Sequence, residues 1–413
     1  MDGQRIKLMK KSPRIQPRMF RGASPDCAAI CGVLLLGVAV AIPAEQSPPK
    51  LELRPEQNVS LRNEVRRAID KGVAWLDKSQ DTNGFWSSAD YPAITALGLM
   101  AHRSQLGTHE QLIDSEVVRR GYNFLLSCVQ PDGGIYRKEL PSYNTSVSLV
   151  ALVLRNRPEY QPLISKARNF IIGLQNLPES GGTTNDAFVG GIGYGKADKR
   201  PDLSNTSLAL EALYVSQPDV KDKNLPVARD LNWPAAIRFI QSCQNLPSHN
   251  PEKWASDDPQ NKGGFIYAPG ESKAGQTNLP SGRTALRSYG SMGYAGLLSY
   301  IYADLKPDDP RVSAVMDWLR ANYTIEENPA MGPQGLFYYY HTMAKALTLC
   351  GANTLTTSEG QSVNWRERLA LKLINLQKAD GSWANENGRW FEKDPALVTA
   401  YALIALEMIY PKI

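Results

Sequence analysis

Apolar residues recur along this chain in two helical patterns that alternate. In the first pattern, seen at 117–128 and 366–376, apolar positions fall three or four residues apart and charged residues fill the gaps. This 3.6-residue period predicts amphipathic helices with one face on a core. In the second pattern, seen at 206–213 and 398–406, the residues are small or apolar nearly all round. A helix of that kind is typically buried on all sides.

The two patterns form a pair that occurs six times, and a turn of glycine and aromatic residues separates the members of each pair. The amphipathic helices are expected to end near 75–76, 124–125, 170–171, 239–240, 318–319 and 373–374. The turns are 84–86, 134–136, 191–194, 264–267, 335–338 and 381–383. The buried helices are expected at 93–101, 145–154, 206–214, 291–301, 342–349 and 398–409.

Six such pairs predict a closed arrangement. An open superhelix would expose the apolar inner helices to water and would need polar capping repeats at both ends. The first and last pairs look like ordinary members. We therefore expect an all-α fold, an α6–α6 toroid with a double ring of about 12 helices and no sheet. Asn144, Asn205 and His341, each followed by threonine, stand where polar residues cap the starts of the buried helices.

The N-terminal region differs from the repeats. Residues 1–26 contain seven basic and two acidic residues, and an apolar run of 16 residues, 27–42, follows and contains Ala39-Val40-Ala41. This order is typical of an export signal, and the run is shorter than the about 20 residues that span a bilayer. We expect residues 1–41 to be a signal peptide or an N-terminal anchor, 42–60 a tether and 61–413 the toroid domain.

Export has consequences for location and for partners. The protein is expected to be periplasmic or extracellular, or attached to the membrane by residues 27–42, with Met1 or Met19 as its start. The whole chain carries a net charge of +5, and residues 1–41 account for all of it. Because the remaining chain has no net charge, the sequence predicts no nucleic-acid partner. Cys128 and Cys243 occupy the same position in two repeats, which indicates buried thiols.

One copy of the turn carries a resemblance to known proteins. Residues 377–383 read Gln-Lys-Ala-Asp-Gly-Ser-Trp, which fits the Q-x-x-D-G-S/G-W motif of squalene and oxidosqualene cyclases. The helix pairing over roughly 61–409 is similar to these cyclases and to the β subunits of protein prenyltransferases. The resemblance implies an α/α toroid whose central cavity binds an isoprenoid or another apolar small molecule.

The acid that such cyclases use is not present at the matching position. Squalene-type cyclases protonate an alkene with the middle aspartate of a D-x-D-D-T segment, which corresponds here to Asp202-Leu203-Ser204-Asn205-Thr206. Ser204 stands at the position of the proton donor, and a hydroxyl group cannot protonate an alkene. Asp202 is therefore a candidate substitute acid, with a capping carboxylate as the alternative interpretation.

The zinc ligands of the prenyltransferases are also incomplete. His341 matches the family's histidine, whereas Arg287 and Tyr289 stand where its aspartate and cysteine belong. Because one ligand does not hold zinc, we expect no metal and no cofactor. His341 remains a candidate catalytic residue, with a structural histidine as the alternative.

Aromatic residues at the turns and at the starts of the buried helices are the candidate cavity lining. Their ring faces suit a cation, an isoprenoid, a lipid or a sugar. The candidates are Tyr91, Tyr143, Tyr289, Tyr340 and Trp383.

Three functions remain open at this stage. The first is a cyclase-like or prenyltransferase-like enzyme with a non-standard acid. The second is a non-catalytic toroid that binds a lipid or a protein. The third is a polysaccharide-active enzyme, which needs two carboxylates across a cleft. Carboxylates on two sides of the cavity would exclude the non-catalytic binder.

Overall fold

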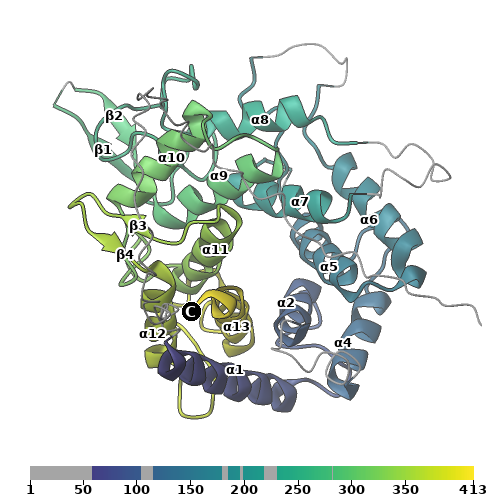
Figure 1. The fold of residues 1–413 in the computed structure, drawn as a ribbon. Helices are drawn as coiled ribbons and strands as arrows, with labels where there is room; N and C mark the ends of the chain where they lie inside the picture. Colours follow the sequence, from purple (N-terminus) through teal and green to yellow (C-terminus); the bar gives the residue numbers. More distant parts are fainter. Residues whose placement is uncertain (1–57, 104–114, 179–184, 196–198, 218–229, 281) are drawn as a thin grey trace, which may run out of the picture.

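A computed structural model describes residues 58–103, 115–178, 185–195, 199–217, 230–280 and 282–413. In these residues twelve α-helices form two concentric layers (Figure 1). The outer helices are α1 (Val59–Ser79), α4 (Glu116–Ser127), α6 (Gln161–Gly173), α8 (Trp233–Ser242), α10 (Pro310–Ala321) and α12 (Trp365–Leu376). The inner helices are α2 (Pro92–Arg103), α5 (Pro141–Arg155), α7 (Leu203–Val215), α9 (Gly290–Tyr302), α11 (Leu336–Leu349) and α13 (Pro395–Ile409).

The inner layer is a closed ring. Each inner helix packs against the next along the chain, and α13 packs against α2. Outer helices cover this ring, with α1 on α13, α4 on α2, α6 on α5 and α10 on α9. In α13, Val398, Ala400 and Leu403 are inaccessible to solvent, because this helix packs against the inner helices α2 and α11 and the outer helices α1 and α12. The predicted α6–α6 toroid is confirmed.

A glutamine at the end of an outer helix ties one repeat to the next. The side-chain amide of Gln80 donates to the glycine carbonyl of its own turn at 3.0 Å and to Val117 O of α4 at 2.8 Å. Gln377 repeats this arrangement where the ring closes, since it donates to its own turn at 2.9 Å and to Ala68 O of α1 at 2.8 Å. The same double contact occurs at Gln175 and Gln244.

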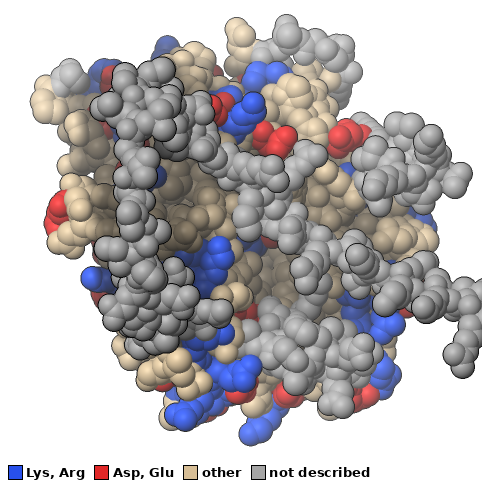
Figure 2. Space-filling model, in the orientation of Figure 1, with Lys and Arg blue, Asp and Glu red and all other residues tan. Residues whose placement is uncertain are grey.

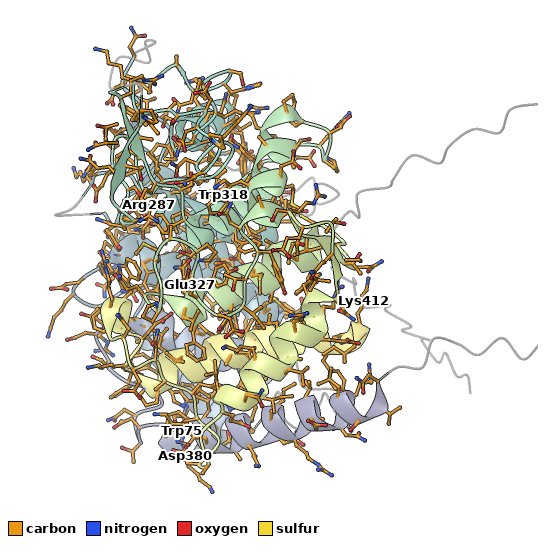
Figure 3. All side chains as sticks on the ribbon, turned by 90° about the vertical axis from the view of Figure 1, so that its left-hand side faces the viewer. Trp75, Arg287, Trp318, Glu327, Asp380 and Lys412 are labelled. Carbon is orange, nitrogen blue, oxygen red and sulfur yellow. The ribbon has the colours of Figure 1, made fainter. Side chains whose placement is uncertain are left out.

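A second contact strengthens this closure. Trp75 of α1 and Asp380 of the turn after α12 lie side by side, and their side chains are hydrogen-bonded (Figure 3). The first and the last repeat are therefore joined in the same way as consecutive repeats.

The polar residues expected to cap the inner helices have other roles, because those helices begin earlier than predicted. α5 begins at Pro141 and α7 at Leu203. Thr145 and Thr206 therefore lie inside their helices, where each hydroxyl accepts a hydrogen bond from a backbone amide of the preceding turn at 2.9 Å. Asn144 accepts from Ala93 N at 3.0 Å and so caps the neighbouring helix α2.

Two small antiparallel hairpins correct the expectation that the chain has no sheet. β1 (Gln276–Asn278) pairs with β2 (Thr284–Leu286), and β3 (Leu355–Thr356) pairs with β4 (Ser362–Val363). Both lie in the connections between helices, where the helical period gives no information. Cys128 and Cys243 are fully buried free thiols, as their shared repeat position indicated.

The predicted signal peptide or anchor, and all but the last three residues of the predicted tether, lie outside the described residues. α1 begins at Val59, and the side chain of Asn58 caps it by accepting from Leu61 N at 3.1 Å. None of the helices in the described ranges has the length and hydropathy needed to cross a membrane. Charged side chains of both signs are visible around the outside of the ring (Figure 2).

Candidate functional site

A cavity of about 430 Å³ opens inside the inner ring, at the N-terminal ends of the inner helices. Every inner helix contributes to its wall, because each presents the face of its first turns to the ring axis. The wall consists of Tyr91, Ile94, Leu140, Tyr143, Tyr194, Ser204, Asn205, Leu208, Tyr267, Tyr289, Ser291, Met292, Tyr338, Gly388, Trp390, Phe391, Glu392, Leu397 and Tyr401. Nine of these side chains are aromatic, so the site is mainly apolar.

Three of the predicted cavity residues, Tyr91, Tyr143 and Tyr289, belong to this wall. Whether they bind a ligand stays a prediction. Tyr289 is buried and Tyr143 is half-buried, and burial raises the pKa of both hydroxyls. Both phenols are therefore neutral at physiological pH.

The structure places Tyr340 and Trp383 outside the wall, which corrects that part of the prediction. Tyr340 points away from the cavity and donates to Ile325 O at 2.6 Å. Since two residues turn a helix by about 200°, Tyr338 faces the axis and Tyr340 does not. Trp383 is buried between the two rings, where its indole donates to Leu373 O at 2.8 Å.

Asp202 lies at the N-cap of α7, behind the wall. Its two oxygens accept from Asn205 N at 2.9 Å and from Asn205 Nδ2 at 2.7 Å, and Tyr267 also hydrogen-bonds to it. Burial raises the pKa of Asp202 to about 6, although these hydrogen bonds act in the opposite direction. Asn205 and Tyr267 belong to the cavity wall and Asp202 itself does not, so its catalytic role stays a prediction.

The neighbouring Ser204 does line the cavity. Its hydroxyl and that of Tyr338 are 3.3 Å apart, a hydrogen bond that links α7 with α11 across the ring. Asn205 also faces the cavity, and its Oδ1 has no hydrogen-bond partner among the described residues. A ligand donor group at this point would satisfy that buried oxygen.

His341 lies one turn below Tyr338, in a small chamber of about 20 Å³ beneath the main cavity. Burial, and then the positive charge of Lys345, lower its pKa well below the ordinary value, so the ring is neutral. Its Nδ1 has no partner in the described part of the chain. Lys345 is held by both oxygens of Glu211 at 2.8 Å. A catalytic role for His341 stays a prediction.

The positions compared with zinc ligands do not form a cluster. Arg287 directly follows β2 and lies beside that hairpin (Figure 3). Tyr289 instead belongs to the cavity wall. Across the described residues, no group of three or more His, Cys, Asp or Glu side chains could hold a metal ion.

Four wall residues outside the predicted cavity set, Gly388, Trp390, Phe391 and Glu392, come from the loop between the last turn and α13. Trp390 and Phe391 are 41% and 56% exposed, and both have left-handed backbone angles, with φ of 56° and 63°. The ring of Phe391 packs on Tyr91 with a centroid distance of 5.3 Å. Left-handed backbone angles at two consecutive aromatic residues are unusual. The available signal in the sequence was the pair of aromatic residues shortly before the start of α13.

Glu392, the last wall residue of this loop, is 1% exposed. Its carboxylate accepts from Tyr338 N at 2.8 Å and from Asn385 Nδ2 at 2.6 Å, and it also receives the amides of Leu336 and Phe337. Burial raises its pKa, while these hydrogen bonds act in the opposite direction. Glu392 therefore caps α11 from within the cavity wall.

Comparison with solved structures agrees with this architecture. The type II terpene cyclase MstE from Scytonema, in complex with merosterolic acid A, is 12% identical, with a TM-score of 0.51 over 86% of this chain and 100% of that chain. The same cyclase with geranylgeranyl dihydroxybenzoate is 11% identical, with a TM-score of 0.50 and the same coverage. Candida albicans protein geranylgeranyltransferase-I is 14% identical over 82% of this chain and 90% of that chain, with a TM-score of 0.48.

No family model and no curated protein sequence matches the chain. At identities this low, the structural similarity establishes the fold. The protein is an α/α toroid of the kind found in type II terpene cyclases, as the resemblance of its turn motif implied.

Proposed function

We propose that this toroid binds an apolar molecule of the isoprenoid class in the cavity at the N-terminal ends of its inner helices. The observation that carries the proposal is the wall itself, in which nine aromatic rings and several aliphatic side chains enclose about 430 Å³. That volume lies within the range of about 300–1,000 Å³ that is usual for small-molecule sites. The two ligands bound to MstE support the isoprenoid class, because both are named as its substrate or product.

We propose further that binding is not followed by proton-initiated cyclisation. Ser204 stands where the cyclase acid is expected, and Asp202 does not belong to the cavity wall. The described part of the wall contains a single carboxylate, Glu392, which accepts hydrogen bonds from Asn385 and from the amides of α11. Glycoside hydrolysis needs two carboxylates, so the wall favours an apolar ligand over a polysaccharide.

Binding can be tested with radiolabelled farnesol and equilibrium dialysis of the full-length protein. Leu208→Trp places a large ring in the cavity wall, and we expect it to weaken binding by at least about tenfold. Leu371→Trp, on the exposed face of α12, is the matched control and should bind as the wild type does. Failure of the wild type to bind, or equal binding by the two variants, would contradict the proposal.

Catalysis is tested separately by product analysis after incubation with squalene. The wild-type protein should return squalene unchanged. A cyclised product from the wild type would overturn the non-catalytic part of the proposal and leave the binding part intact.

We also propose that the protein is exported, with residues 1–41 as signal peptide or anchor. The support is the order of basic, apolar and small residues in that segment. N-terminal sequencing of the protein recovered from outside the cytoplasm should begin near residue 42 for a cleaved signal peptide and at Met1 or Met19 for an anchor. Recovery only in the cytoplasmic fraction would contradict export.

A further inference from the structure

The described cavity wall contains an acidic side chain but no basic one. Of the nineteen wall residues, Glu392 is the one ionisable side chain other than tyrosine, and the described wall contains no lysine, arginine or histidine. The hydrogen-bond partners of Glu392 are neutral amides, from Asn385 and from the first turn of α11. When Glu392 is ionised, its negative charge at this helix N-terminus is stabilised by the helix dipole, and the described wall holds no cation that neutralises it.

The aromatic rings of the wall favour a positive charge as well, because the face of an aromatic ring attracts cations. Two wall rings already bind cations from outside the cavity. The ammonium group of Lys273 lies 4.4 Å from the ring centroid of Tyr267, and the guanidinium group of Arg389 lies 4.4 Å from that of Trp390. Lys273 is held there by Glu271, and Arg389 donates to Gln334. No lysine, arginine or histidine belongs to the described wall, so no wall residue offers a cation to the ring faces that line the cavity.

From this arrangement we infer that the cavity prefers an apolar ligand that carries a positive charge, an amine or a quaternary ammonium group, placed next to Glu392. The inference rests on the proposed function and narrows its ligand class. It also implies that isoprenoid phosphates and carboxylates bind poorly, since the described wall has no cation to pair with an anion. A buried carboxylate and nine ring faces would replace part of the water around an ammonium group.

Three probes of nearly equal size test this inference on the wild-type protein. They are farnesyl methyl ether, which is neutral, N,N-dimethylfarnesylamine, which is cationic at pH 7, and farnesoic acid, which is anionic. Dissociation constants are measured by isothermal titration calorimetry below the concentration at which each probe aggregates. We expect the amine to bind at least about tenfold more tightly than the ether, and the acid more weakly than either.

The variant Glu392→Gln tests whether Glu392 causes the preference for the cationic amine. It removes the charge but keeps a carbonyl oxygen for the amide of Tyr338, and we expect it to weaken amine binding by about tenfold while ether binding changes by less than about threefold. Glu386→Gln, an exposed residue of the same loop, is the control and should leave both affinities unchanged. Circular dichroism melting curves show whether each variant is folded.

The binding results distinguish a failure of the charge preference from a failure of the proposed isoprenoid binding. If none of the three probes binds the wild type, the proposed function fails. If the ether binds and the amine binds no better, or the acid binds best, the charge preference alone is overturned. If Glu392→Gln does not fold, the order of the three wild-type affinities still decides.

Discussion

The carboxylate of Glu392 accepts a hydrogen bond from the backbone amide of Tyr338 at 2.8 Å, so a loop residue that precedes α13 caps the neighbouring helix α11. α11 begins after Gly335, which has no side chain to satisfy the free amides of the first turn. The same contact holds the loop with Trp390 and Phe391 against the inner ring. One buried carboxylate thus links helix stability to the shape of the cavity.

Removal of this cap should destabilise the toroid. We expect Glu392→Ala to lower the free energy of unfolding by about 1–2 kcal/mol, because the amides of the first turn of α11 lose their acceptor inside the protein. Glu386→Ala, on the exposed part of the same loop, should change it by less than about 0.5 kcal/mol. Urea denaturation measures both values, and equal values would show that Glu392 does not cap α11.

Asp202 should make stability depend on pH. Its pKa rises from 3.8 to about 6 on folding, so the folded state binds the proton more tightly than the unfolded state. The stability that this group contributes is therefore fully present below pH 4 and is lost as the pH rises through 6. The loss should be on the order of 3 kcal/mol.

The measurement compares the wild type with Asp202→Asn, which resembles the protonated side chain. Urea denaturation at intervals from pH 4 to pH 8 should show the wild type losing stability relative to the variant as the pH rises. Parallel curves for the two proteins would mean that Asp202 does not titrate in this range.

Replacement of a turn glycine by any other residue should destabilise the protein. Gly381 has φ of +98°, and a Cβ atom there would lie 2.5 Å from Lys71 O of α1. Gly360 has φ of +76°, but a Cβ atom there would meet nothing within 4 Å. We expect Gly360→Ala to cost about 1–2 kcal/mol through backbone strain and Gly381→Ala at least about 2 kcal/mol more through the clash. Similar thermal unfolding curves for the two variants would refute this close approach.

The glutamine that links consecutive outer helices should also be important for stability. Gln244 is 1% exposed, donates to Gly263 O and Arg311 O at 2.9 Å, and accepts from the Tyr300 hydroxyl at 2.8 Å. Gln244→Ala leaves these buried groups unpaired, and we expect a loss of about 3 kcal/mol. Gln260→Ala removes an exposed side chain and is the matched control. A loss below about 1 kcal/mol for Gln244→Ala in urea denaturation would contradict the role of this link.

The helical period and the turn motif were sufficient to predict the fold, because both are local properties of the chain. Six amphipathic and six apolar helices need a closed double ring to bury their surfaces, and the structure has this ring. The same patterns pointed to Tyr91, Tyr143 and Tyr289, which lie in the cavity wall, and α2 and α9 start within one residue of the expected positions.

Errors arose where the exact start of a helix decides the direction of a side chain. α11 begins at Leu336, six residues before the predicted start, and each residue turns a helix by about 100°. That difference brings Tyr338 to the cavity and turns Tyr340 to the outside. Trp383 was misplaced for a related reason, because the turn in which it lies faces the space between the two rings.

The sequence by itself determined the double ring of helices, the glycine turns and the apolar nature of the interior, since each depends on residues close together in the chain. The glutamine links between repeats, such as that from Gln377 to Ala68, join residues far apart and were found only in the tertiary structure. Only the tertiary structure decided the electrostatics of the cavity. Glu392 meets Tyr338 across 54 residues, and Ser204 meets Tyr338 across 134. Such contacts depend on how loops and helices of different repeats approach each other, and no periodicity in the sequence encodes that approach.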